Sequence, residues 1–434
     1  MCDFVSGEVL FAFPDHPRAI EALSAWFNDH GAQENVRVLD RLDYRLNALD
    51  LPEEARLKSS QQLWRIQVPP GQEAFMSNLI RQKYHHALLV FGVLKDDQAP
   101  ELLMNVGAEP NLLLTLADSP GSHSLYENRG LRLSPVHEDY KRIIGVDDSG
   151  REMADQARGP IVALVDSGIT GDLIDRVDRQ IDLVSPEQFG RPAEKAAEDQ
   201  VLHGTAIASI IADVAPAARF MVYRVADEYG QVSEWDVIAA LLSLGDADVV
   251  NLSLAFGLAG GDCRTCGRSA NSSRSWVFER NLDLLTKKIN APIVVSAAGN
   301  ASADRLYYPA RFPDVVAIGS LNSRLEVSTF SNYGNTDHLN HPHRGVWFLP
   351  GGDDRPGQIE AAIVVGDDDK PLFGTSIACA YASAIITRLL GQHKRSEVIS
   401  MLRAGAGASM VGYSPDIHGH GRMSLPSMRS QTPD

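Results

Sequence analysis

The sequence predicts an α/β protein in which a parallel sheet with helices on both faces follows a small ferredoxin-like α/β domain. Two observations lead to this fold class. From about residue 160 onward, short apolar runs rich in Val and Ile alternate with runs at helical spacing, and this alternation is typical of a parallel sheet that is buried on both faces. In the first 95 residues, the expected elements follow the order β-α-β-β-α-β of a ferredoxin-like unit.

The small domain is assigned to residues 1–95. Strands are expected at 8–13, 36–42, 63–68 and 87–93, and helices at 16–30 and 72–84. In the first helix, Ile20, Leu23, Trp26 and Phe27 recur at the spacing of one helical face. The strand at 63–68 alternates apolar and polar residues until Pro69-Pro70-Gly71 ends it.

Residues 96–159 are predicted to be a connector, because they are rich in Pro, Gly, Asn, Ser and Asp. Within this connector, short segments at 131–135 and 140–146 are expected to pack onto the domain that follows. A connector of this length is usually either functional or a linker.

The large domain is assigned to residues 160–434. Its strands are expected at 161–165, 219–225, 249–254, 293–297 and 315–319, and its helices at 205–211, 233–244 and 281–289. In open parallel sheets, ligands bind at the carboxyl ends of the strands. Asp166 and Asn300 fall at such ends, which makes both candidates for chemistry.

Composition excludes several classes of partner. The 434 residues are 44% hydrophobic and carry a net charge of −16, and an acidic surface disfavours nucleic acid as a partner. No apolar run approaches the roughly 18–20 residues of a membrane span. The N-terminus lacks the basic start and long apolar core of a secretion signal, so a cytoplasmic location is expected.

The cysteines indicate neither a disulfide framework nor a complete metal site. There are four of them: Cys2, Cys263, Cys266 and Cys379. Cys263 and Cys266 form a lone C-x-x-C, whereas a zinc site needs two further ligands. A Gly-rich loop with two thiols, a redox-sensitive loop and an intermolecular metal site all stay open for this segment. No metal and no cofactor are predicted.

Three short motifs supply the parts of an activated nucleophile. Asp166 ends the apolar run 161–165, His203 opens an apolar helix in the run His-Gly-Thr, and Ser376 lies in Gly-Thr-Ser-Ile-Ala. A serine hydroxyl becomes a useful nucleophile when an imidazole takes its proton and a carboxylate orients that imidazole. Taken singly, each residue also has an ordinary structural role, and Ser376 is most often a helix cap.

These motifs, in the chain order Asp, His, Ser, resemble those of the subtilisin-like serine protease family (subtilases, peptidase S8). The resemblance covers residues 160 to about 428, so the expected architecture of this part is the subtilisin-like parallel sheet. Further runs fit the same order: Val-Asn-Leu-Ser-Leu at 250–254 and Ala-Ala-Gly-Asn at 297–300. The resemblance implies a serine endopeptidase that hydrolyses protein or peptide substrates.

The resemblance also implies roles for residues around the triad. Asn300 would donate a hydrogen bond to the oxyanion. Ser253, Leu254 and Ala255 would pair with an extended substrate as an added strand. Ala297, Ala298 and Gly299 would line the pocket for the side chain before the cut.

Two questions stay open at this point. Subtilases often carry an N-terminal α/β propeptide that blocks the active site, and residues 7–95 match it in size and element order. The alternative is a permanent recognition domain. A non-enzymatic binding scaffold on a protease fold is the competing function, although none of the four chemical residues is missing.

Overall fold

A computed structural model describes most of the chain. The described residues are 4–43, 61–90, 106–116, 130–146, 159–184, 199, 201–256, 275–288, 290–334, 345–404 and 410–429. Cys2, Cys263 and Cys266 lie outside these ranges. Across the described ranges, every helix is too short or too polar to span a bilayer.

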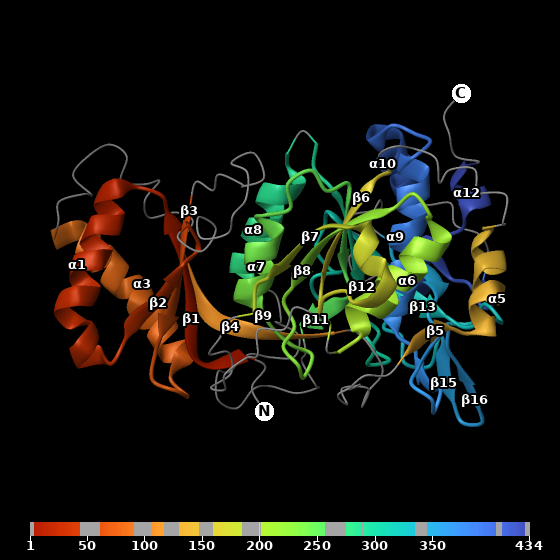
Figure 1. The fold of residues 1–434 in the computed structure, drawn as a ribbon. Coiled ribbons are helices and arrows are strands. Elements are labelled where there is room, and N and C mark those ends of the chain that lie inside the picture. The colour runs from red at the N-terminus through yellow and green to blue at the C-terminus, as the bar shows by residue number, and fades with distance from the viewer. Residues whose placement is uncertain are drawn as a thin grey trace.

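A parallel sheet of eight strands forms the centre of the large domain (Figure 1). Its strands are, in spatial order, β19 (Gly421–Arg422), β14 (Trp347–Pro350), β13 (Val315–Leu321), β12 (Ile293–Ala297), β10 (Val249–Leu252), β6 (Ile161–Asp166), β8 (Arg219–Arg224) and β7 (Val177–Asp182). All neighbouring strands in this sheet are parallel. The predicted α/β class with a parallel sheet is therefore confirmed.

Helices cover both faces of this sheet. The helices described after β6 are α6 (His203–Val214), α7 (Glu234–Leu241), α8 (Trp276–Thr286), α9 (Thr375–Leu390), α10 (Arg395–Ala404), α11 (Pro415–His418) and α12 (Leu425–Arg429), with a 3-10 turn at Gly171–Arg176. Short strands complete the domain: β9 (Gln231–Ser233), β11 (Leu254–Phe256), β15 (Asp353–Arg355), β16 (Gln358–Glu360), β17 (Ile363–Val365) and β18 (Lys370–Leu372).

Alternation along the strands divides the core into two layers. In β6, Val162 and Leu164 pack with α6 and α9, whereas Ala163 and Val165 pack with α7 and α8. Successive strand residues point to opposite faces, which is why a strand covered on both sides reads as a continuous apolar run. Helix α9 is buried almost all round, as expected for a helix in the middle of a large domain.

The N-terminal unit is a four-stranded antiparallel sheet with strand order β4-β1-β3-β2. Its elements are β1 (Phe4–Pro14), α1 (Pro17–Glu34), β2 (Arg37–Arg41), β3 (Gln61–Gln67), α3 (Glu73–Val90) and β4 (Gly107–Leu116). The chain therefore has the β-α-β-β-α-β order that the sequence predicts. One strand was misplaced, because residues 87–90 continue helix α3 and the fourth strand lies at 107–116.

The two faces of this small sheet have different neighbours. Phe11 and Phe13 of β1 face α1 and α3 in a separate core. Leu10 and Ala12, on the opposite face of β1, join the core of the large domain that contains α7 and α8. The small sheet is thus sandwiched between its own helices and those of the large domain (Figure 1).

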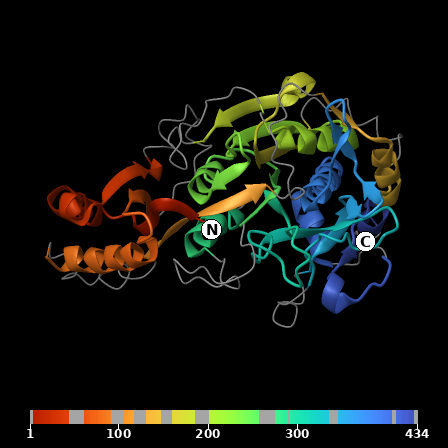
Figure 2. The same ribbon diagram turned by 90° about the horizontal axis from the view of Figure 1, so that it is seen from below.

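Strand β4 belongs to both domains. Its first half pairs with β1, and its second half pairs antiparallel with β9 on one side and β11 on the other. Figures 1 and 2 show β4 leaving the small sheet and entering the large domain. Leu114, Thr115 and Leu116 lie opposite Phe256, Ala255 and Leu254.

The connector also contributes ordered structure. Strand β5 (Leu131–Leu133) pairs with β17, and α5 (Pro135–Ile144) follows it, capped by the Ser134 hydroxyl. Tyr140 and Ile144 of α5 are fully buried in the core of the large domain. The expectation that these segments pack onto the following domain is therefore confirmed.

Candidate active site

An aspartate and a histidine meet at the carboxyl end of the central sheet. Asp166 is the last residue of β6, and its Oδ1 accepts a hydrogen bond of 2.8 Å from Nδ1 of His203, the first residue of α6. Asp166 is 0% exposed and His203 is 2% exposed. Because Nδ1 donates to the carboxylate, the neutral ring presents Nε2 as its acceptor.

Ser167 and a glycine bring α6 this close to β6. The Ser167 hydroxyl donates to Asp166 Oδ1 at 3.2 Å and accepts from the Gly204 N–H at 2.9 Å. A Cβ on Gly204 would lie 2.2 Å from the carbonyl oxygen of Gly168. Glycine at 204 is therefore required for the approach that joins Asp166 to His203.

Asp199 holds the turn that leads into His203. Leu202 has φ +61, a conformation that costs a non-glycine residue free energy. The buried Asp199 carboxylate accepts bonds from the N–H groups of Leu202 at 2.8 Å and Thr205 at 2.9 Å, and from the Thr205 hydroxyl at 2.7 Å. Burial raises the pKa of Asp199. The sequence prediction missed this residue, which no motif marks.

Ser376 lies in the first turn of α9, as predicted, but it is not the helix cap. The residue at the N-cap position is Gly374. Ser376 is 0% exposed, and its Oγ makes no hydrogen bond within the described part of the chain. A buried hydroxyl without a structural bond is unusual. The capping role that a serine normally fills is thus not the role of Ser376.

The buried Asn251 anchors α9 beneath β10. Its Nδ2 donates to Ser383 Oγ at 2.9 Å and to Cys379 Sγ at 3.3 Å, and its Oδ1 accepts from Ser253 Oγ at 2.9 Å. Burial raises the pKa of the Cys379 thiol to about 12, so this cysteine, one turn beyond Ser376, is no thiolate nucleophile. Asn251 was not predicted, although a polar residue inside an apolar strand is a usable signal.

Asn300 is fixed by the residue that precedes Ser376. Its Oδ1 accepts bonds from the N–H and the hydroxyl of Thr375, at 2.9 and 2.8 Å. These bonds assign the amide oxygen, so Nδ2 is the donor group of the Asn300 side chain. The Ser376 N–H belongs to the first helical turn, where N–H groups have no intrahelical acceptor and attract negative charge.

The predicted substrate-binding residues surround the same point. Ser253 Oγ donates to the carbonyl oxygen of Ser376 at 3.3 Å, and Leu254 and Ala255 continue from it as β11. Ala297 ends β12, and the Gly299 N–H donates to Thr375 Oγ1 at 3.3 Å. The structure therefore brings together Ser253–Ala255, Ala297–Gly299, Asn300 and Ser376.

Strand β4 lies beside the predicted substrate-binding strand β11, as the middle strand of three. Its partners on the two sides are β9 and β11. The register places Leu116 opposite Leu254, next to Ser253, so β4 runs toward Ser376. This is the position that the prediction gave to an extended substrate.

Side chains of the small domain reinforce this contact. The Glu109 carboxylate accepts from the Trp276 N–H at the start of α8, at 3.2 and 3.3 Å, and the Asn111 amide oxygen accepts from the Trp235 N–H in α7 at 3.2 Å. Gly107 packs directly on Trp276, since a Cβ there would lie 2.4 Å from the ring. The first turns of two helices of the large domain, α7 and α8, are thus bonded to β4.

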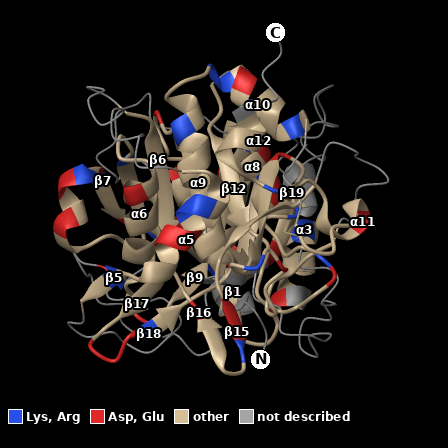
Figure 3. Cartoon of the chain, turned by 90° about the vertical axis from the view of Figure 1, so that its right-hand side faces the viewer, with Lys and Arg blue, Asp and Glu red and all other residues tan. Residues whose placement is uncertain are grey.

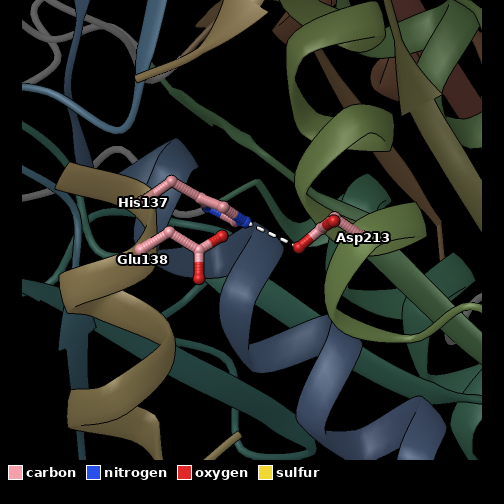
Figure 4. Close-up of side chains that lie close together, drawn as sticks. All are labelled: His137, Glu138 and Asp213. Carbon is pink, nitrogen blue, oxygen red and sulfur yellow. Dashed lines mark hydrogen bonds and ion pairs between the residues drawn. The ribbon is translucent and has the colours of Figure 1, made fainter. Parts of the chain in front are cut away.

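His137, Glu138 and Asp213 form the one cluster of possible metal ligands found in the described ranges (Figure 4). His137 uses both ring nitrogens, bonding Tyr381 OH at 2.5 Å and Asp213 at 2.9 Å. Lys141 Nζ lies 3.1 Å from both Asp213 and Glu138. The Lys141 ammonium already occupies the place of a cation. The cluster instead links α5 to α6 and α9, and these three helices lie side by side in Figure 3.

Comparison with known proteins points to one family. The sequence model of the Subtilase family (Peptidase S8) matches residues 157–404. The "Thermophilic serine proteinase" of Bacillus sp. (strain AK1) is 24% identical over 304 residues, which cover 67% of this chain and 64% of that protein. "Subtilisin Savinase" of Lederbergia lenta is 28% identical over 154 residues, covering 33% of this chain and 51% of that protein. The chain spans less than two thirds of the length of these relatives.

A solved structure extends the likeness to the whole chain. The epidermin leader peptide processing serine protease (EpiP) of Staphylococcus aureus aligns over 99% of this chain and 100% of its own, with a TM-score of 0.62 and 16% identity. At this identity the likeness concerns the fold.

Proposed function

The chain belongs to the Subtilase family, and on that premise we propose that it is a serine endopeptidase whose own N-terminal domain blocks the substrate cleft. The observation that carries the catalytic proposal is the buried 2.8 Å bond between Asp166 and His203. His203 is the first residue of α6, which packs beside α9. Ser376, in the first turn of α9, has a buried hydroxyl that makes no hydrogen bond within the described part of the chain.

The mechanism follows from these positions. Ser376 Oγ attacks the peptide carbonyl while His203 Nε2 takes the hydroxyl proton, and Asp166 stabilises the imidazolium. The Ser376 N–H and Asn300 Nδ2 donate to the oxyanion. The tetrahedral intermediate expels the amine, which receives the proton from His203. Water then hydrolyses the acyl-enzyme by the same steps and restores the serine.

The inhibitory role of the N-terminal domain is supported by strand β4. An extended peptide binds a protease cleft by main-chain hydrogen bonds to an exposed strand, and β4 already makes such pairs with β9 and β11. Ser376 and His203 are 0% and 2% exposed in the full chain. A substrate therefore reaches them only when β4 leaves.

The test uses a fluorophosphonate probe, in which an activated serine displaces fluoride and forms a P–O bond. The full-length chain is compared with Ser376→Ala, Thr115→Pro and Thr115→Ser. Proline removes a backbone donor from the part of β4 that pairs with β9 and β11, whereas serine keeps it. We expect Thr115→Pro to label faster than wild type, Thr115→Ser to label like wild type, and Ser376→Ala not to label.

The outcomes separate the competing readings. Labelling that persists in Ser376→Ala would exclude Ser376 as the nucleophile. If a folded Thr115→Pro chain is not labelled and does not hydrolyse an unfolded protein such as casein, the non-enzymatic binding scaffold is favoured. The cytoplasmic location and the absence of a nucleic-acid partner stay predictions from the sequence.

A further inference from the structure

A tyrosine ring occupies the space beside the glycine that ends the predicted pocket wall. A Cβ on Gly299 would lie 2.9 Å from Cδ2 and 3.2 Å from Cγ of Tyr307. The two segments are also joined through the backbone, because the Tyr307 N–H donates to the Ala298 carbonyl oxygen at 2.9 Å. The ring of Tyr307 therefore packs directly against the wall Ala297–Gly299.

The surroundings of Gly299 indicate which way this ring faces. Asn332, whose Nδ2 lies 2.6 Å from the same Cβ position, is fully buried. Tyr307 is only half-buried, so part of its side chain borders the surface rather than the core. The Gly299 N–H points to Thr375, the neighbour of Ser376. The ring thus packs on the wall residue whose N–H contacts the neighbour of Ser376.

We infer that Tyr307 fills the pocket for the residue before the cut and restricts this enzyme to peptides with a small side chain, such as Ala, at that position. The inference rests on the proposed function and adds its substrate preference. A substrate side chain would enter between Ser253–Ala255 and Ala297–Gly299, and on this inference the ring that packs on Gly299 takes part of that space. A methyl group fits beside the ring, whereas a second ring does not.

The test compares two tetrapeptide p-nitroanilides that are identical except for Ala or Phe before the anilide. Full-length wild type, Tyr307→Gly and Tyr307→Phe are assayed, with Tyr307→Ser as a second small variant if the glycine lowers the Tm. Occupancy of the cleft by β4 lowers the apparent affinity of both peptides by the same factor. The ratio of their kcat/KM values therefore reports the pocket alone.

We expect wild type to prefer Ala by at least about tenfold, and removal of the ring to shift the ratio toward Phe by roughly 10- to 200-fold, the range for a changed apolar pocket. Tyr307→Phe keeps the ring and should keep the ratio. A wild-type preference for Phe, or a ratio that does not change in Tyr307→Gly and Tyr307→Ser, would overturn the inference.

A binding measurement separates this inference from the proposed function. In a Ser376→Ala background, calorimetry gives Kd values for product-like peptides that end in Ala or Phe. If no variant hydrolyses peptide but the Kd ratio shifts with Tyr307→Gly, the proposed function fails and the pocket assignment stands. If peptides are hydrolysed and the ratio does not shift, only the pocket assignment fails. A chain that neither binds nor hydrolyses them when Thr115→Pro is added to release β4 overturns both.

Discussion

Replacing Gly107 by alanine should release the N-terminal domain from the active site. The added Cβ would lie 2.4 Å from Cε3 and 2.5 Å from Cζ3 of Trp276, far inside contact distance, at the junction of β4 with α8. Overpacking of this kind costs typically 1–3 kcal/mol. If that cost falls on the contact between the domains, the open population rises about 5- to 150-fold.

The assay is the rate of fluorophosphonate labelling at Ser376, which is proportional to the open population while that population is small. The control is a double-mutant cycle with Trp276→Ala, because the three atoms nearest to the added methyl all belong to the Trp276 ring. Gly107→Ala should accelerate labelling of the chain that keeps Trp276 and have little effect on the chain that carries Trp276→Ala. An unchanged rate in Gly107→Ala, or an equal rise in both backgrounds, would refute the reasoning.

Three further predictions concern the large domain. Asn300→Ala removes an oxyanion donor and should lower kcat by on the order of 10²–10³ with little change in KM; an unaltered kcat would exclude Asn300 from the oxyanion site. Asp199→Asn replaces the acceptor facing the Thr205 N–H and hydroxyl by a donor, so urea unfolding should show a loss of about 1–3 kcal/mol, whereas Asp416→Asn at the exposed surface should show almost none. The bond from His137 lowers the pKa of Asp213 from 3.8 to about 2; a depressed carboxyl pKa stabilises the fold above pH 3.8, and that contribution is lost as the pH falls toward 2. Acid unfolding curves should therefore lose part of their slope between pH 4 and 2 in Asp213→Asn, and an identical slope would show that the pair does not contribute.

The large domain could be predicted from sequence because its elements carry strong local signals. A buried parallel strand reads as an uninterrupted apolar run, as in 161–165 and 293–297, and each of these runs is a strand. Asp166 and Asn300 could be chosen as candidates because they follow such runs at the carboxyl edge of the sheet.

The misplaced strand shows the limit of local signals. Residues 87–93 form an apolar run next to a helix, and such a run fits a strand and a helical extension equally well. Residues 87–90 join α3. The strand that completes the small sheet lies at 107–116, in a region whose composition indicated a connector.

Long-range contacts had no sequence signal at all. The pairing of β4 with β11 joins residues far apart in the chain, and β4 resembles any other apolar strand. Asp199 is one acidic residue among 56, and its importance comes from the turn at Leu202 that it holds. These features depend on what the fold brings together, so only the structure could assign them.

If β4 blocks the cleft as proposed, its position makes the inhibition depend on the integrity of the chain. As long as one polypeptide joins β4 to the large domain, the strand would compete with substrate at an effective concentration set by the connecting segment. Diluting the protein does not change that value. A single cut beyond Leu116 would convert the contact into a complex of two molecules, which dissociates when the protein is diluted below its Kd. The cleft would then be blocked in a concentrated solution and accessible to substrate in a dilute one, with no other ligand required.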